Sequence, residues 1–220
     1  MAWFSRKTRD PEQGSDGPRP LSERSLDPLL SMLWEPQGFH AEQYRGLRNS
    51  IATLNPQNAP RTLLITSALE GEGKSTSITN LGLCLAELPN TRVCLLDADL
   101  RAPVIHEILD LPNQPGLSEV LSGAASLREV IQPSGLDGLD IIPAGQGVAN
   151  PSEAVAGERM IEVLHQLKPR YAYTLVDSPP TLAVTDASML APQADGVLVI
   201  VRLEKTARNE AMEAIQLLEN

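Results

Sequence analysis

Aromatic residues make up only 3 % of the 220-residue sequence, and cysteine occurs twice. A hydrophobic core must therefore be built from aliphatic side chains, which a hydrophobic content of 42 % allows. Cys84 and Cys94 have neither metal-binding nor redox spacing, so we interpret them as buried thiols. The three histidines are scattered along the sequence, which therefore offers no zinc site.

Long apolar runs and an excess of positive charge are also lacking. The run GVLVIVRL is too short to cross a bilayer, and the start MAWFSRKTRDPEQG lacks the apolar core of a signal peptide. Both features predict a cytoplasmic protein. The formal charge of −10 disfavours a dedicated nucleic-acid-binding protein, because such proteins have a basic face. We therefore expect no nucleic-acid partner.

The composition divides the chain near residue 38. Residues 1–38 are rich in Pro, Gly, Ser and charged residues, which predicts a flexible tail, and residues 39–220 are expected to form one domain. Short apolar runs, typical of buried strands, occur at 61–67, 91–99, 139–145, 171–180 and 196–203. Helical patterns occur at 40–54, 75–88, 116–123, 126–133, 151–168, 185–194 and 207–220.

This alternation predicts an α/β fold with a parallel sheet covered by helices on both faces. The sequence ends inside the last predicted helix, where a doubly wound domain has room for a further strand. We therefore expect either a truncated product or a shortened fold.

A glycine-rich stretch follows the first predicted strand. Residues 68–75, ALEGEGKS, match the phosphate-loop pattern of a small residue, four further residues and Gly-Lys-Ser, with Ala68 in place of the first glycine. Glycines let backbone N–H groups point at phosphate oxygens, and the next helix adds partial positive charge at its N-terminus. A chance match in a loop is the alternative, but the flanking strand and helix favour a nucleotide site made by Gly71, Glu72, Gly73, Lys74, Ser75 and Thr76.

The ligands expected at this loop are ATP and Mg²⁺. In the phosphate-loop pattern, Lys74 would reach the β- and γ-phosphates, and Ser75 would ligate the metal. Thr76 would contact the α-phosphate.

Two later strands end in aspartates. Asp97 and Asp99 end the run VCLLDAD, and Asp177 ends YTLVD. Ligands of such sheets gather at the carboxyl ends of the strands, and alternate strand residues face the same way, so we expect these carboxylates to share one site. Asp177 has the place of a Walker B carboxylate that holds Mg²⁺. The alternative, aspartates that only form turns, is weakened by the nearby phosphate loop.

Together, SALEGEGKST, CLLDADLR and TLVDSPP resemble the Walker A, A′ and Walker B motifs of the bacterial tyrosine kinases (BY-kinases) of capsule and exopolysaccharide export, which are relatives of the MinD and ParA ATPases. GLSEVLSG and IIPAGQGVANPSEAVAGERM are similar to connectors of that family. The resemblance covers residues 40–219. It implies a P-loop NTPase with a doubly wound, mostly parallel sheet, and ATP-dependent phosphorylation of tyrosine in the control of polysaccharide polymerisation and export.

Leu69 separates the two branches of this superfamily. MinD and ParA resemble one another in carrying a lysine at this position of the loop, which reaches across a dimer. Leucine stands here instead, so the resemblance favours the kinase branch.

The resemblance also implies roles for individual residues. Lys74, Asp97 and Asp99 would serve catalysis, with one aspartate ordering Mg²⁺ and the other accepting the tyrosine proton. We assign the base to Asp99 and the metal to Ser75, Asp97 and Asp177. Arg101 is expected to hold phosphate or the carboxylates, with a surface position as the alternative.

The segment EQYRGLR carries Glu42, Arg45 and Arg48 in the Glu-x-x-Arg-x-x-Arg pattern by which the family assembles into rings. The spacing places the three side chains on one helix face. A solvated charged face is the commoner outcome for such a segment alone. With the other motifs present, we expect an interface of a homo-oligomeric ring.

The match fails at one feature, because the family usually ends in a tyrosine-rich autophosphorylation tail. This sequence has only Tyr44, Tyr171 and Tyr173. Either that tail is missing, or another protein is the acceptor, or no kinase activity occurs. The implied partners are a separate membrane chain-length-determinant protein (polysaccharide co-polymerase) as activator and a tyrosine phosphatase. The activator would hold the chain at the inner face of the plasma membrane. The alternatives are a MinD/ParA-type ATPase switch and a non-catalytic nucleotide-binding assembly factor of an export complex.

Overall fold

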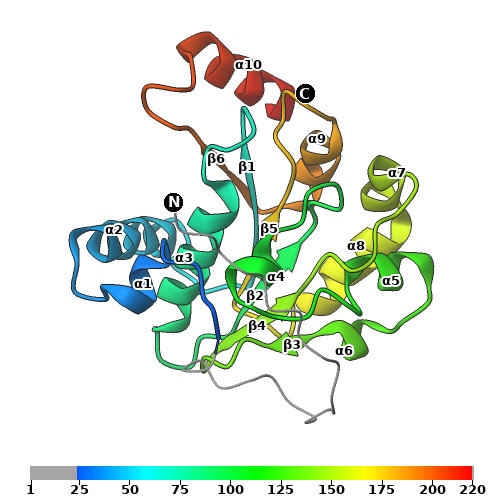
Figure 1. The fold of residues 1–220 in the computed structure, drawn as a ribbon, viewed down its shortest axis with the longest axis horizontal. Coiled ribbons are helices and arrows are strands. Elements are labelled where there is room, and N and C mark those ends of the chain that lie inside the picture. The colour runs from blue at the N-terminus through cyan, green and yellow to red at the C-terminus, as the bar shows by residue number, and fades with distance from the viewer. Residues whose placement is uncertain (1–23, 220) are drawn as a thin grey trace, which may run out of the picture.

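The computed structural model describes residues 24–219, built around a six-stranded sheet with the order β3-β4-β2-β5-β1-β6 (Figure 1). The strands are β1 (Arg61–Ser67), β2 (Val93–Asp97), β3 (Gln132–Pro133), β4 (Leu139–Ile142), β5 (Tyr173–Asp177) and β6 (Gly196–Ile200). Every strand pair is parallel except β3–β4, which is antiparallel. The predicted doubly wound, mostly parallel sheet is confirmed, and β1, β2 and β5 bring the predicted motifs to one edge of it.

Alternating side chains of the strands form two aliphatic cores. In β1, Leu63 and Ile65 face one core, whereas Leu64 faces the other. Both faces of the central strands are buried, which explains why their sequences are almost continuously apolar. Cys84 and Cys94 are buried free thiols, as expected.

Helices cover the two faces in separate groups (Figure 1). One core contains residues of α1 (Ser31–Trp34), α2 (Phe39–Thr53), α3 (Lys74–Ala86) and α4 (Ile105–Ile108). The other contains residues of α5 (Leu117–Ser122), α6 (Leu127–Val130), α7 (Pro151–Ala156), α8 (Glu158–Leu167) and α9 (Asp186–Leu190). The 3-10 helix η2 (Ala191–Gln193) continues α9, and α10 (Arg208–Glu219) follows β6. α1, α4 and β3 were not predicted.

The segment before α2 packs on the domain. Leu30 is 0 % exposed and Met32 is 5 % exposed, both within the core beneath α2 and α3. The side chain of Asn80 in α3 accepts the N–H of Met32 at 3.1 Å and donates to the Leu29 carbonyl at 3.1 Å. The prediction of a flexible tail over 1–38 is therefore wrong for residues 24–38, because a few apolar residues among many polar ones are enough to anchor them. Residues 1–23 lie outside the described part of the chain.

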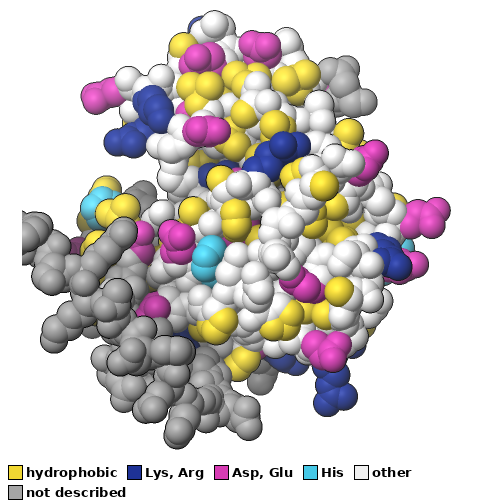
Figure 2. Space-filling model, turned by 45° about the vertical axis from the view of Figure 1, so that its right-hand side comes forward, with side chains coloured by type: hydrophobic (Ala, Val, Ile, Leu, Met, Phe, Trp, Pro, Cys, Tyr) yellow, Lys and Arg dark blue, Asp and Glu magenta, His cyan; other side chains and the backbone are white. Residues whose placement is uncertain are grey.

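The end of the molecule formed by β6 and α10 is more exposed. Hydrophobic side chains gather on the upper part of the face in Figure 2, and Leu203, Met212 and Leu217 are among the exposed large hydrophobic residues. Within residues 24–219, none of the helices has the length and apolar character needed to span a membrane.

Candidate active site

The phosphate loop connects β1 to α3. Gly71 and Gly73 have φ angles of 70° and 87°, in the left-handed region where a side chain is strained. Gly73 is the N-cap of α3, so the backbone turns into the helix directly before Lys74. The sequence therefore places glycine where this turn requires it, and the helix N-terminus faces the cavity.

A connection between β6 and α10 holds the outer side of this loop. We call Arg202, Lys205 and Thr206 the β6–α10 clamp. The Lys205 ammonium donates to the Glu70 carbonyl at 2.6 Å, and the Arg202 guanidinium donates to the Gly71 carbonyl at 3.3 Å. Two loop carbonyls are thus engaged from outside by cations that the motif did not predict.

Glu72 links the clamp to the loop. Its carboxylate accepts the Leu69 N–H at 2.8 Å and the hydroxyl of Thr206, and the residue is only 6 % exposed. We predicted Glu72 as a nucleotide-binding residue, but its side chain braces the loop in this structure. Leu69, where MinD and ParA carry lysine, contributes its backbone N–H to this brace.

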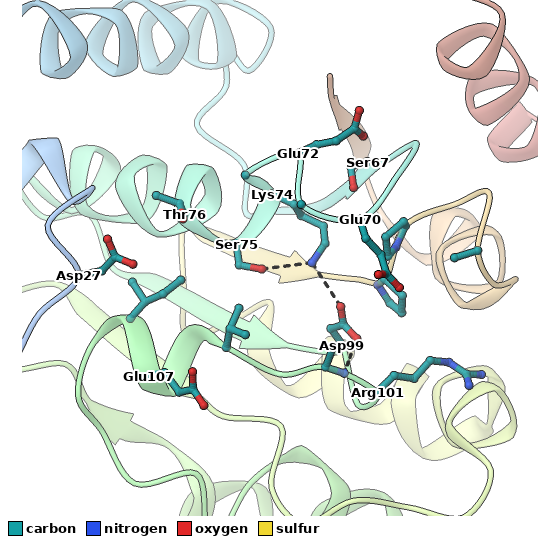
Figure 3. A pocket seen from close by; sticks show the side chains of 18 of the residues that line it. Asp27, Ser67, Glu70, Glu72, Lys74, Ser75, Thr76, Asp99, Arg101 and Glu107 are labelled. Atoms are coloured by element: carbon teal, nitrogen blue, oxygen red, sulfur yellow. Dashed lines mark hydrogen bonds and ion pairs between the residues drawn. The ribbon is translucent and has the colours of Figure 1, made fainter. Parts of the chain in front are cut away.

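Lys74 lies between two buried carboxylates, those of Asp177 and Asp99, and Figure 3 shows the lysine beside Asp99 and Ser75. Its ammonium is 2.9 Å from Asp177 Oδ1 and 3.4 Å from Asp99 Oδ2, and it also donates to the Ser75 hydroxyl at 3.2 Å. Burial alone would lower the pKa of Lys74, but the negative charges of Asp177 and Asp99 outweigh burial and raise it. The lysine is therefore held in its charged form.

Asp177, at the end of β5, is fully buried, and its carboxylate accepts hydrogen bonds from two side chains of α3, the Lys74 ammonium and the Ser75 hydroxyl. Its Oδ2 accepts the Ser75 hydroxyl at 2.6 Å. Burial raises the pKa of Asp177, while Lys74 and Ser75 act in the opposite direction. Lys74 and Ser75 thus offset part of the cost of burying this carboxylate in its charged form.

Asp97 and Asp99 do not face the cavity together, in contrast to our expectation. β2 ends at Asp97, so strand alternation does not extend to Asp99. The Asp97 carboxylate accepts the N–H groups of Asp99 and Ile105, both at 3.2 Å, whereas Asp99 lines the cavity. Burial and the nearby Asp177 charge raise the pKa of Asp97 well above its usual range. The geometry gives Asp97 the task of holding the loop after β2.

Arg101 points away from Lys74 (Figure 3). Its guanidinium binds the buried carboxylate of Asp186 at 3.1 and 3.3 Å and the Ser152 hydroxyl at 2.8 Å. Asp186 begins α9 and Ser152 lies in α7, so Arg101 ties the loop after β2 to two helices. The guanidinium of Arg101 thus binds Asp186 rather than the carboxylates of Asp97, Asp99 and Asp177. Arg101 also lines the cavity, and its role in phosphate binding stays a prediction.

The site has the donors that a nucleotide and Mg²⁺ require. The P-loop fold implies nucleotide binding, and the phosphate loop lines a cavity of about 730 Å³. Ser75 Oγ and Asp177 Oδ2 are oxygen ligands of the kind that Mg²⁺ prefers. Across residues 24–219, no group of three or more His, Cys, Asp and Glu side chains is arranged to hold a metal. A bound Mg²⁺ would therefore complete its coordination with phosphate oxygens and water.

The predicted ring-interface residues form contacts within the chain. Arg45 is paired with Glu42 at 2.6 Å and with Glu87 at 2.9 Å, and Arg48 is paired with Glu87 at 3.0 Å. Arg48 also donates to the Cys84 carbonyl. The two arginines hold α2 on α3, and of the three predicted residues Glu42 has the most exposed side chain, at 61 %.

Sequence reasoning missed several residues that line or support the site. Residues 25–28, Val104, Glu107 and Ile108 contribute to the wall of the cavity, and Asp186 supports Arg101. Leu26, Leu29 and Leu30 in SERSLDPLL were the available signal for an anchored segment. The partners of Arg101 are far away in sequence, and no pattern in the neighbouring residues predicts these contacts.

Comparison with known proteins agrees with this geometry. A family model described as an AAA domain matches residues 61–220. The tyrosine-protein kinase YwqD of Bacillus subtilis (strain 168) is 36 % identical over 180 residues, which cover 82 % of this chain and 76 % of the relative. The kinase domain of the Escherichia coli tyrosine kinase ETK has a TM-score of 0.83 at 32 % identity, covering 86 % of this chain and 74 % of that chain.

The wider superfamily is visible in the fold alone. The septum site-determining protein MinD of Pyrococcus horikoshii OT3, complexed with Mg-ADP, has a TM-score of 0.63 at 24 % identity, covering 73 % of this chain and 65 % of that chain. The identity and the TM-score are both higher for the ETK kinase domain than for this MinD. The chain therefore belongs to the bacterial tyrosine kinases, which share the P-loop fold of the MinD-like ATPases.

Proposed function

We propose that this chain is an ATP-dependent protein tyrosine kinase that regulates the polymerisation and export of capsular polysaccharide or exopolysaccharide. The observation that carries this proposal is the meeting of Lys74 and Ser75, at the start of α3, with Asp177 at the end of β5 and Asp99 just after the end of β2. Phosphoryl transfer requires positioned donors and charge neutralisation more than covalent chemistry, and this cluster provides both.

Each residue of the cluster has a distinct proposed role. The loop amides and Lys74 bind the β- and γ-phosphates of ATP, and Ser75 and Asp177 hold Mg²⁺, which neutralises charge on the phosphates. The tyrosine oxygen forms a bond to the γ-phosphorus while the bond from that phosphorus to the β–γ bridging oxygen breaks. Asp99 accepts the tyrosine proton, and ADP leaves. The Asp97 carboxylate accepts the backbone N–H of Asp99 and so keeps Asp99 in place.

The acceptor is proposed to lie outside residues 1–220. Tyr171 and Tyr173 are 4 % and 5 % exposed, and Tyr44 is half-buried against the core. A tyrosine must leave its packing to reach an active site. Tyr44 lies in α2, Tyr173 begins β5 and Tyr171 is buried just before that strand, so all three support the fold. Phosphorylation of a separate segment or protein is therefore favoured over modification of these tyrosines.

The proposed partners follow from membership of the family. They are a membrane chain-length-determinant protein (polysaccharide co-polymerase) that activates the kinase, further copies of the chain in a ring, and a tyrosine phosphatase that reverses the reaction. The activator would place the chain at the cytoplasmic face of the plasma membrane.

The proposal is tested with purified chain, Mg·ATP and the cytoplasmic segment of a chain-length-determinant protein from the same gene neighbourhood. Phosphotyrosine is mapped by mass spectrometry, with Lys74→Met as the matched blank. We expect phosphotyrosine on the added segment that requires Lys74. ATP binding without any phosphotyrosine would contradict the kinase proposal and favour an ATP-dependent assembly factor.

A further inference from the structure

The cavity extends well beyond the phosphate loop. We call its far part the annex, which is lined by residues 25–28, Ala102, Val104, Glu107 and Ile108 (Figure 3). Lys74 and Asp99 lie at its inner end (Figure 3). The annex therefore opens directly on the groups that we propose to bind the γ-phosphate and accept the tyrosine proton.

The annex combines an apolar wall with an acidic rim. Leu26, Val104 and Ile108 supply aliphatic surface. Asp27 and Glu107 carry its negative charge (Figure 3). Glu107 has a side chain that is 72 % exposed, so its charge faces the entrance. An aromatic ring fits the wall, and a cation beside that ring fits the rim.

The N-terminal wall of the annex is held in place by several contacts. The N–H of Ser25 donates to Asp110 Oδ2 at 2.9 Å, and the N–H of Asp27 donates to the Ile108 carbonyl at 3.1 Å. Asp27 Oδ1 in turn accepts the Leu29 N–H at 2.7 Å. The wall is thus joined to the end of α4, and the Asp27 carboxylate has a defined position.

From this arrangement we infer that the annex binds the acceptor tyrosine of a protein substrate and selects a tyrosine flanked by Lys or Arg. The tyrosine ring packs on the aliphatic wall, its hydroxyl points toward Asp99, and the flanking cation pairs with Asp27 and Glu107. The inference rests on the proposed kinase function and names its substrate class. The net charge of −10 acts in the same direction, because it attracts basic segments.

The adenosine of ATP is the competing occupant, and the chemistry of the annex argues against it. A neutral purine can only donate hydrogen bonds to the two carboxylates, whereas a cation also gains ion pairing with them, and a polyphosphate is repelled by them.

The inference is tested by peptide binding, which does not require catalysis. Fluorescein-labelled Gly-Ala-Lys-Tyr-Lys-Ala-Gly is titrated with the chain and Mg·AMPPNP, beside matched peptides with Gln or Glu in both Lys positions. We expect the Lys peptide to bind about tenfold more tightly than the Glu peptide, and the ratio to fall to about two in Asp27→Asn/Glu107→Gln. The asparagine retains an oxygen for the Leu29 N–H, and Glu107→Gln alone provides a second, exposed variant.

The matched control is Glu162→Gln/Glu213→Gln, which removes two exposed carboxylates outside the cavity lining and should keep the tenfold ratio. Equal binding of the three peptides, no binding of any, or a preference that survives in Asp27→Asn/Glu107→Gln would overturn the inference. Weaker binding of fluorescent ATP by that variant would assign the annex to adenosine and also overturn it. In a parallel reaction with Mg·ATP in place of Mg·AMPPNP, selective peptide binding without phosphate transfer to any peptide would refute the proposed function and leave the annex as a peptide site.

Discussion

Gly116 lies against the backbone of the loop that follows β4, with no room for a side chain. A Cβ atom at this position would approach the Gly145 nitrogen and the Pro143 carbonyl oxygen to less than 3.0 Å. Because backbone atoms cannot rotate away, we expect Gly116→Ala to lower the free energy of unfolding by about 3 kcal/mol, measured by urea denaturation. Gly147→Ala, where no atom lies within 4 Å, should change it by no more than about 0.5 kcal/mol. Equal effects of the two substitutions would contradict this account.

Glu119 is a second residue with a predictable effect, and its effect depends on pH. Burial acts to raise the pKa of Glu119, but the N–H groups of Gly116 and Gln146 and the Ser118 hydroxyl outweigh it and lower the pKa below 4.5. A carboxylate whose pKa is lower in the folded state than in the unfolded state contributes its full stabilisation at pH values above the unfolded-state pKa. This contribution is lost as the pH falls through the folded-state pKa.

We therefore expect Glu119→Gln to cost about 2 kcal/mol at pH 7, because charge-assisted hydrogen bonds are weakened. The difference from the unsubstituted chain should shrink as the pH is lowered toward about 3. Urea midpoints of both proteins across this range provide the measurement. A difference that is constant with pH would exclude the ionised carboxylate as the cause.

At the scale of elements, the β6–α10 clamp supports the phosphate loop from outside the nucleotide cavity. Thr206→Val keeps the shape of the side chain but removes the hydroxyl that donates to the buried Glu72. We expect the dissociation constant of a fluorescent ATP analogue with Mg²⁺ to rise roughly tenfold, because the loop amides lose their fixed orientation. Thr206→Ser restores the hydroxyl and should restore affinity. Unchanged affinity in the valine variant would show that the clamp does not position the loop.

Elements with a strong local signal were predictable, and those fixed by distant partners were not. β1, β2 and β5 are apolar runs that end in the loop or in aspartates, so both the sheet and the neighbourhood of Lys74 and Asp177 followed from the sequence. α1 and α4 have four residues each, too few to show helical periodicity. Residues 24–38 are held by partners such as Asn80, which no local pattern reveals.

The details of the site had the same limit. Asp97 and Asp99 were expected to point the same way, which holds only while a strand continues. The strand ends at Asp97, and the backbone N–H groups of Asp99 and Ile105 donate to the Asp97 carboxylate. Arg101 pairs with Asp186, which is distant in sequence, and the spacing of residues along a sequence does not predict such a pair.

At the scale of the whole molecule, the proposed ring depends on the exposure of three side chains of α2. Glu42 is 61 % exposed, whereas Arg45 and Arg48 are 23 % and 14 % exposed and already hold Glu87. We expect Glu42→Ala to shift the oligomer toward monomer with little change in stability, as measured by size-exclusion chromatography with light scattering. Arg48→Ala should instead cost about 1–2 kcal/mol of folding stability, because it breaks the α2–α3 contact. An unchanged molar mass of Glu42→Ala would remove Glu42 from the interface.

The pairing of Lys74 with Asp177 and Asp99 affects the free energy with which a nucleotide binds. The Lys74 ammonium is already paired with carboxylates of the protein. A phosphate that binds this ammonium must therefore replace one of them as its ion-pair partner. ATP arriving alone would leave two buried carboxylates facing a polyanion, which is costly without a compensating charge. A divalent cation that takes over Asp177 removes this conflict. If Asp177 binds the metal as proposed, we expect metal and nucleotide to be thermodynamically coupled ligands, each raising the affinity for the other by the same factor.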